Sequence, residues 1–152
     1  ADFKNLSISQ ALQTIAEKNL TFVSRGDDSG THKKELELWS TAGSHLDFKS
    51  YTETGQGMGN TLMIANELKA FTLCDAGTYL QFQDKIALSP VSSHDELLEN
   101  RYSVITVTPD QNQQINAEAA QELYNFLNSR KAAALIKNYQ LNGNPLFTPL
   151  NL

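Results

Sequence analysis

The sequence predicts an α/β fold, and two observations carry the prediction. Short β-branched and aromatic segments alternate along the chain with segments whose apolar residues recur at helical spacing. Glycine, serine and threonine gather where several of the short segments lead into a helical pattern. The chain has 152 residues, of which 40% are hydrophobic and 19% charged, enough for one domain with a core or for two small lobes. Such alternation favours an α/β fold over a helical bundle or a β-sandwich.

The first part of the chain alternates most regularly. Ser7 and Gln10 form a capping box at the start of the first predicted helix. The predicted helices cover residues 6–16, residues 29–43, the segment leading to Leu68, and a turn at 75–79. The predicted strands cover residues 21–24, 51–53, 71–74 and 86–88.

The second part begins with a predicted linker at residues 89–100, SPVSSHDELLEN. RYSVITV, at 101–107, is the strongest strand pattern in the chain. Residues 116–139 are helical with a break near Asn128-Ser129, and the tail NGNPLFTPLNL is predicted to be a loop.

The charge balance argues against two kinds of main partner. The net charge is -5, with an isoelectric point near 5.1, which argues against nucleic acid or an anionic membrane.

The single cysteine, Cys74, excludes an internal disulfide. No apolar run has the length of a membrane span. The first residues lack a signal-peptide pattern, so we expect either a cytosolic chain or a natural start upstream of residue 1.

The stretch FVSRGDDSGTH, residues 22–32, predicts a binding site for a small anion. Asp28 or Ser29 can cap the helix that follows, which leaves the N–H groups of Gly30, Thr31 and His32 free for a ligand. The stretch also contains Arg25, whose planar guanidinium suits oxyanions, and Asp27 or Asp28 can hold that group in place.

Two other interpretations of this stretch stay open. In one, Asp-Ser-Gly-Thr is an ordinary helix cap and Arg25 pairs with an aspartate at the surface. In the other, Ser29 and His32 belong to a serine hydrolase, although the spacing departs from G-x-S-x-G. The Arg-Gly-Asp tripeptide at 25–27 is a chance match to a cell-adhesion motif.

A second glycine-rich stretch, TGQGMGNT at residues 54–61, precedes another helix. It lacks the lysine of a P-loop, and its glycines miss the G-x-G-x-x-G spacing. It predicts either a second helix start with free N–H groups, which would complete a cage around a dianion, or a tight turn that needs positive φ.

No pattern of metal ligands or catalytic groups stands out. The histidines, His32, His45 and His94, have no metal-ligand spacing to one another or to Cys74. No pair of carboxylates is placed as a general acid and base. We therefore expect no enzyme activity, no metal and no cofactor.

Several stretches together closely resemble the tungstate-binding proteins of bacterial ABC transporters, which are type II periplasmic binding proteins. These stretches are FVSRGDDSGTHKKELELW, YTETGQGMGNTLMIANE, FTLCDAGTYLQF, RYSVITV and NGNPLFTPLNL. They cover essentially the whole chain in order. Residues 25–31 are also similar to the R-x-D-x-S-G-T anion loop of phosphate-binding relatives.

The resemblance implies the C-terminal portion of a type II periplasmic-binding-protein fold. Residues 1–99 would be lobe two, and residues 100–152 would cross over and return to lobe one, whose N-terminal part is not in this sequence. Asp27 would orient the arginine. The implied ligand contacts are Arg25, Ser29, Gly30, Thr31, Gln56, Gly57 and Met58.

The function implied is that of an extracytoplasmic solute-binding component that captures tungstate between two lobes for a membrane permease. We expect a periplasmic or membrane-anchored extracellular protein, monomeric when full length. Molybdate, sulfate or phosphate as ligand, a hydrolase that uses Ser29 and His32, and a stand-alone oxyanion sensor are the alternatives.

Overall fold

A computed structural model describes residues 3–91, 95–108 and 114–150 of the chain. The chain divides into two compact units, residues 1–99 and residues 100–152. Their assignment to two lobes stays a prediction. Among the described residues, no helix is long and apolar enough to cross a membrane.

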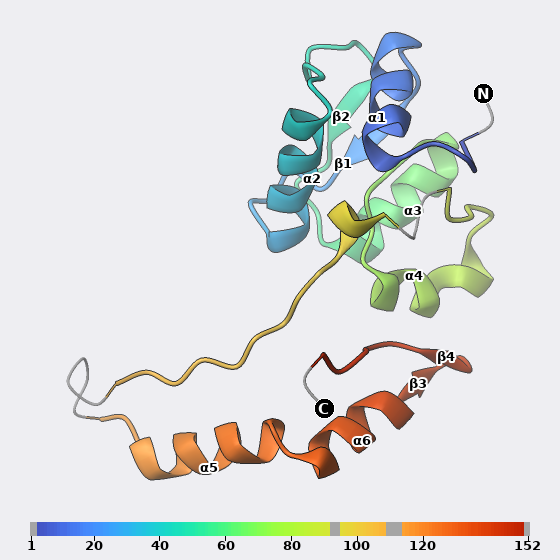
Figure 1. The fold of residues 1–152 in the computed structure, drawn as a ribbon. Coiled ribbons are helices and arrows are strands. Elements are labelled where there is room, and N and C mark those ends of the chain that lie inside the picture. Colours follow the sequence, from blue (N-terminus) through green and yellow to red (C-terminus); the bar gives the residue numbers. More distant parts are fainter. Residues whose placement is uncertain (1–2, 92–94, 109–113, 151–152) are drawn as a thin grey trace. The chain divides into compact units, whose positions relative to one another are not determined.

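The first unit is built on a small parallel sheet (Figure 1). Strand β1 (Phe22–Ser24) pairs in parallel with β2 (Tyr51–Glu53). On the other side of β1, Phe22 forms a single parallel bridge with Phe71, so residues 71–74 contribute one ladder position instead of the predicted strand. Residues 86–88, also predicted as a strand, join no ladder in the described part of the chain.

Helices alternate with these strands along the chain, as the sequence predicts. They are α1 (Ile8–Glu17), α2 (Gly30–Thr41), α3 (Met58–Leu68) and α4 (Ala76–Phe82), followed by the short 3₁₀ helices η1 (Gln83–Lys85) and η2 (Glu96–Leu98). The predicted capping box is confirmed, because the Ser7 hydroxyl accepts from the Gln10 N–H and the Gln10 side chain accepts from the Ser7 N–H. Asp95 accepts from the Ile8 N–H at 2.9 Å and so ties the end of the unit to α1.

Successive residues of β1 face opposite ways, as side chains of a strand must, and so contribute to two cores. Phe22 belongs to the larger core, where its ring meets the edge of Trp39 at 5.1 Å between centroids. Val23 belongs to a smaller core with Ala65 of α3 and Ala70. The remaining buried members of the larger core, from α1, α2 and the residue after α2, are Ile8, Leu12, Ile15, Leu38 and Ala42.

The second unit contains a helical pair and a small hairpin. Helices α5 (Ala117–Leu127) and α6 (Arg130–Asn138) are separated at Asn128-Ser129, where the sequence predicted the break. Strands β3 (Gln140–Leu141) and β4 (Asn144–Pro145) pair antiparallel in a region predicted to be a loop.

The predicted strand at 101–107 is wrong for this structure. These residues have no strand assignment, and the ladders found among the described residues lie elsewhere. A strand exists only where a neighbour supplies hydrogen bonds, and β-propensity alone does not supply one. Ile105, in the middle of the segment, is 83% exposed.

Candidate anion-binding site

The two glycine-rich loops lie side by side because the parallel ladder continues beyond both strands. The Thr54 N–H donates to the Ser24 carbonyl at 3.0 Å, and the Gly55 N–H donates to the Arg25 carbonyl at 2.8 Å. Both loops therefore leave the sheet at the carboxyl ends of adjacent parallel strands. That edge is where open α/β sheets bind ligands.

The first loop turns at two residues with positive φ. Gly26 has φ +59°, and a Cβ added there would lie 2.6 Å from Cβ of Glu53, so only glycine fits between the strands. Asp28 has φ 57° and completes the turn that brings the chain to the start of α2. This backbone explains why the loop contains the sequence Gly-Asp-Asp.

Arg25 is held by Asp27. The guanidinium donates from Nε at 3.0 Å and from Nη2 to the same carboxylate oxygen, Oδ2, while the other oxygen accepts from the Ser29 N–H at 3.2 Å. Hydrogen bonding from Ser29, and then from Arg25, lowers the pKa of Asp27 from 3.8 to about 2. Nη1 has no hydrogen-bond partner among the residues that the structure describes. The contact with Asp27 therefore leaves the Nη1 side of the Arg25 guanidinium available to a ligand.

The start of α2 supplies backbone donors. Ser29 is the N-cap, and its hydroxyl accepts from the His32 N–H at 3.3 Å. The expectation that the His32 N–H is free was therefore wrong, because the cap occupies it. In the described part of the chain, the N–H groups of Gly30 and Thr31 have no hydrogen-bond partner.

The start of α3 has no side-chain cap. Gly57 is its N-cap, and the N–H groups of Gly57 and Met58 have no partner within the described residues. The Met58 side chain is only 6% exposed, so this residue can offer a ligand its main chain but not its thioether. Gln56 lies at the surface, where its side-chain oxygen is 3.5 Å from Nδ2 of Asn60.

Two threonines that the sequence reasoning missed hold the second loop. Their hydroxyls, Thr54 Oγ1 and Thr61 Oγ1, lie 3.0 Å apart, and Thr61 is fully buried. Thr61 Oγ1 also donates toward the carbonyls of Gln56 and Gly57, at 3.3 and 3.2 Å. The sequence signal was weak: a hydroxyl residue at each end of TGQGMGNT.

A buried acid behind the first loop was also missed. Glu35 is 3% exposed and accepts a hydrogen bond from the Tyr51 hydroxyl at 2.9 Å. Burial raises the pKa of Glu35, and the Tyr51 contact opposes that effect. Its position three residues before Leu38 and four before Trp39, the spacing of one helix face, could have indicated that it is buried.

The arrangement suits binding better than catalysis. The Ser29 hydroxyl caps α2, and the His32 imidazole accepts through Nδ1 from the Asp28 N–H at 3.0 Å, so serine and imidazole do not form a nucleophile–base pair. Burial raises the pKa of the Cys74 thiol to about 12. No group of three or more potential metal ligands occurs in the described ranges.

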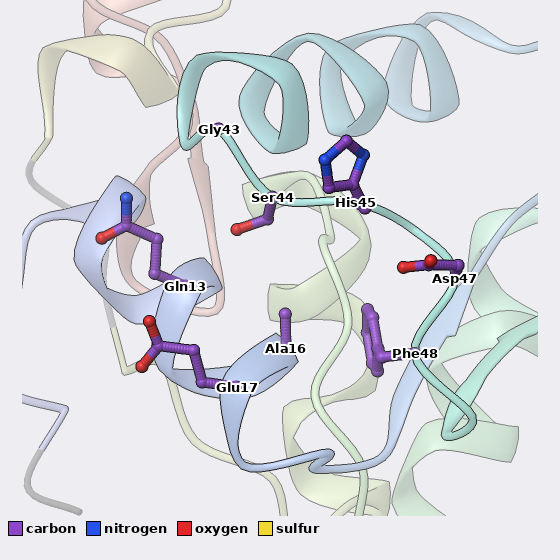
Figure 2. A pocket seen from close by; sticks show the side chains of 8 residues that line it. All are labelled: Gln13, Ala16, Glu17, Gly43, Ser44, His45, Asp47 and Phe48. Carbon is purple, nitrogen blue, oxygen red and sulfur yellow. The ribbon is translucent and has the colours of Figure 1, made fainter.

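A separate hollow lies at the other end of α2 (Figure 2). Its volume is about 380 Å³, and it is lined from α1 and from the segment that follows α2. Because α2 has 12 residues, the hollow lies about 18 Å along the helix from the anion loop. None of the predicted site residues lines it. The lining residues are Gln13, Ala16, Glu17, Gly43, Ser44, His45, Asp47 and Phe48.

Two helix starts and an arginine lie at one edge of a parallel sheet, which is the arrangement of an α/β unit whose candidate site suits an anion. The profile of the PBP superfamily domain matches residues 2–131, and the chain belongs to this superfamily. The α/β fold class and the binding-protein resemblance predicted from the sequence are thus confirmed.

Several of the similar proteins have descriptions that name tungstate. The chain is 45% identical over 141 residues to the tungstate-binding protein TupA of Peptoclostridium acidaminophilum. The matched residues make up 91% of this chain and 49% of that protein. The solved structure of the tungstate-binding protein TupA from Desulfovibrio alaskensis G20 matches with a TM-score of 0.89 and 34% identity, over 99% of this chain and 62% of that one. The solved tungstate ABC transporter structure from Geobacter sulfurreducens matches with a TM-score of 0.73 and 33% identity, over 90% and 58%. The chain therefore spans about half to three fifths of the length of these relatives.

Proposed function

We propose that this chain is part of the solute-binding component of an ABC importer and binds tungstate between two lobes. The observation that carries the proposal is that two helix starts lie beside an arginine held by Asp27, and their first N–H groups have no hydrogen-bond partner among the described residues. The proposal is supported by the similarity to tungstate-binding proteins. It includes the assignment of residues 1–99 to lobe two and of residues 100–152 to the return to lobe one.

The proposed contacts fall into two groups. Arg25, Ser29, Gly30 and Thr31 supply a guanidinium, hydroxyls and N–H groups from the first loop. The second group, Gln56, Gly57 and Met58, acts mainly through the main chain at the start of α3. The other lobe supplies the remaining donors of the cage.

Recognition rests on replacing the water around a dianion by fixed donors. Helix N-termini and a forked guanidinium both favour negative charge, whatever the net charge of the protein. Tungstate carries no proton at neutral pH and needs no acceptor. The Asp27 carboxylate already accepts hydrogen bonds from Arg25 and Ser29, which disfavours a protonated phosphate. Binding involves no bond making, so we infer a protein that is not an enzyme.

The biological setting follows from the same proposal. The partner is the membrane permease of the importer, which would recognise the closed form. The protein works outside the cytoplasm and is a monomer when full length. Molybdate, with the charge and tetrahedral shape of tungstate, is the principal competing ligand, and sulfate and phosphate are the others.

The test is a calorimetric titration of the gene product, expressed from its natural start, with tungstate, molybdate, sulfate and phosphate in turn. Preference for tungstate supports the proposal. Equal binding of several anions keeps the site but removes the tungstate assignment, and absence of binding by all four overturns the function.

A further inference from the structure

The His32 side chain lies close to both loops of the candidate site. Its side chain is 12% exposed and lies between the first loop and the end of β2. Nδ1 accepts a hydrogen bond from the Asp28 N–H at 3.0 Å, and Nε2 lies 3.8 Å from Oε1 of Glu53. Glu53 is the last residue of β2, directly before the second loop.

The first contact stabilises an unusual turn. Asp28 has φ 57°, a left-handed conformation that is uncommon for a residue with a Cβ. The imidazole acceptor gives the Asp28 N–H a partner in that conformation. Asp28 immediately precedes the N-cap Ser29, so its orientation sets the direction of the Gly30 and Thr31 N–H groups.

The second contact follows from the first. Because Nδ1 accepts a hydrogen bond, it carries no proton, and the proton of the neutral ring is on Nε2. This buried N–H has no hydrogen-bond partner among the described residues, and it faces Glu53. Glu53 in turn packs over Gly26, where a Cβ would come within 2.6 Å of its own. The imidazole thus contacts the turn of the first loop and the residue that introduces the second.

We propose that His32 is a positioning residue for oxyanion binding: its Nδ1 fixes the Asp28 turn and its ring sets the first loop against the second. The inference rests on the proposed function. It assigns no ligand contact to the imidazole. The essential property is an acceptor at the Nδ1 position.

Two matched substitutions separate this role from simple space filling. In His32→Asn the amide oxygen can occupy the position of Nδ1 and accept from Asp28. In His32→Gln the amide lies near the position of Nε2 and offers no acceptor at Nδ1. Calorimetry with tungstate on the gene product should show His32→Asn close to wild type and His32→Gln about tenfold weaker, the effect of one buried unmade hydrogen bond. Circular dichroism checks that both variants fold.

Equal affinity of the two variants, whether retained or lost, would overturn the inference. If wild type binds tungstate and Arg25→Ala abolishes binding while both His32 variants bind normally, only this inference fails. If wild type binds no oxyanion, the proposed function fails and this inference fails with it.

A measurement on the wild type covers the case in which both variants unfold. The ¹⁵N shifts of the His32 imidazole and the exchange rate of the Asp28 amide are recorded with and without tungstate. A proton on Nε2 and a protected Asp28 amide support the positioning role. A proton on Nδ1, or a freely exchanging Asp28 amide, overturns it.

Discussion

Oδ2 of Asp27 accepts hydrogen bonds from both Nε and Nη2 of Arg25. One carboxylate oxygen thus fixes one edge of the guanidinium plane, and the second oxygen is tied to the backbone of Ser29. The arginine is held in one orientation without a ligand, so the proposed binding of an oxyanion would cost less conformational freedom.

Replacing Arg25 tests whether oxyanion binding needs the planar guanidinium or only its positive charge. We expect Arg25→Ala to abolish tight tungstate binding and Arg25→Lys to recover only part of it, because an ammonium keeps the charge but cannot hold the Asp27 contact and a ligand in one plane. The measurement is calorimetry, with thermal unfolding as the check on the fold. Wild-type affinity in Arg25→Lys would show that charge alone suffices.

The ionisation of Asp27 predicts how this loop responds to acid. Hydrogen bonding from Ser29 foremost lowers its pKa from 3.8 to about 2, so its stabilising contribution is complete above 3.8 and is lost as the pH falls through about 2. The ¹³C shift of the Asp27 carboxyl should therefore stay constant from pH 8 to pH 4. A midpoint near pH 4 would mean that the contacts with Ser29 and Arg25 are absent in solution.

Gly26→Ala should destabilise the protein strongly. The new Cβ meets Cβ of Glu53 at 2.6 Å and also requires φ +59°. Gly43→Ala is the matched control, because it has φ +66° but open space around it, and should cost only about 1–2 kcal/mol. Thermal unfolding of the two variants measures the difference. Equal losses would mean that β2 moves aside easily.

Glu35 predicts a pH-dependent term in stability. Burial raises its folded-state pKa above 4.5, so the folded state binds more protons than the unfolded state in the interval above 4.5. Its contribution therefore declines as the pH rises from 4.5 through the folded-state pKa. Glu35→Gln keeps an acceptor for Tyr51 and should remove this decline. The prediction would be contradicted if the free energy of unfolding changed with pH in the same way for wild type and variant between pH 4.5 and pH 8.

The sequence predicted the parts of the fold that depend on local rules. Ser7 and Gln10 indicated the start of the first helix, and Asp28 or Ser29 the start of the second, where the structure shows Ser29 as the cap. Capping uses atoms that are close in sequence. The sequence also predicted the break between α5 and α6, where the structure shows Ser129 as the N-cap of α6. These features need no knowledge of distant neighbours.

The failures concern groups whose environment is set by distant partners. RYSVITV has the composition of a strand but no ladder in the described second unit, and Phe71 alone of its predicted strand finds one. The two candidate loops could be identified one at a time, but their adjacency depends on the register that pairs Ser24 with Glu53. Glu35 and Thr61 escaped notice because burial of a polar side chain depends on tertiary contacts.

The start of α3 has a consequence for the diversification of such sites. The donors there that have no partner in the described part of the chain belong to the main chain, the cap is a glycine, and Met58 is buried. Main-chain N–H groups are chemically alike in every residue except proline. Side-chain drift at these positions therefore leaves the donors unchanged, and a lineage that acquires a new ligand must reshape the backbone or alter the residues opposite.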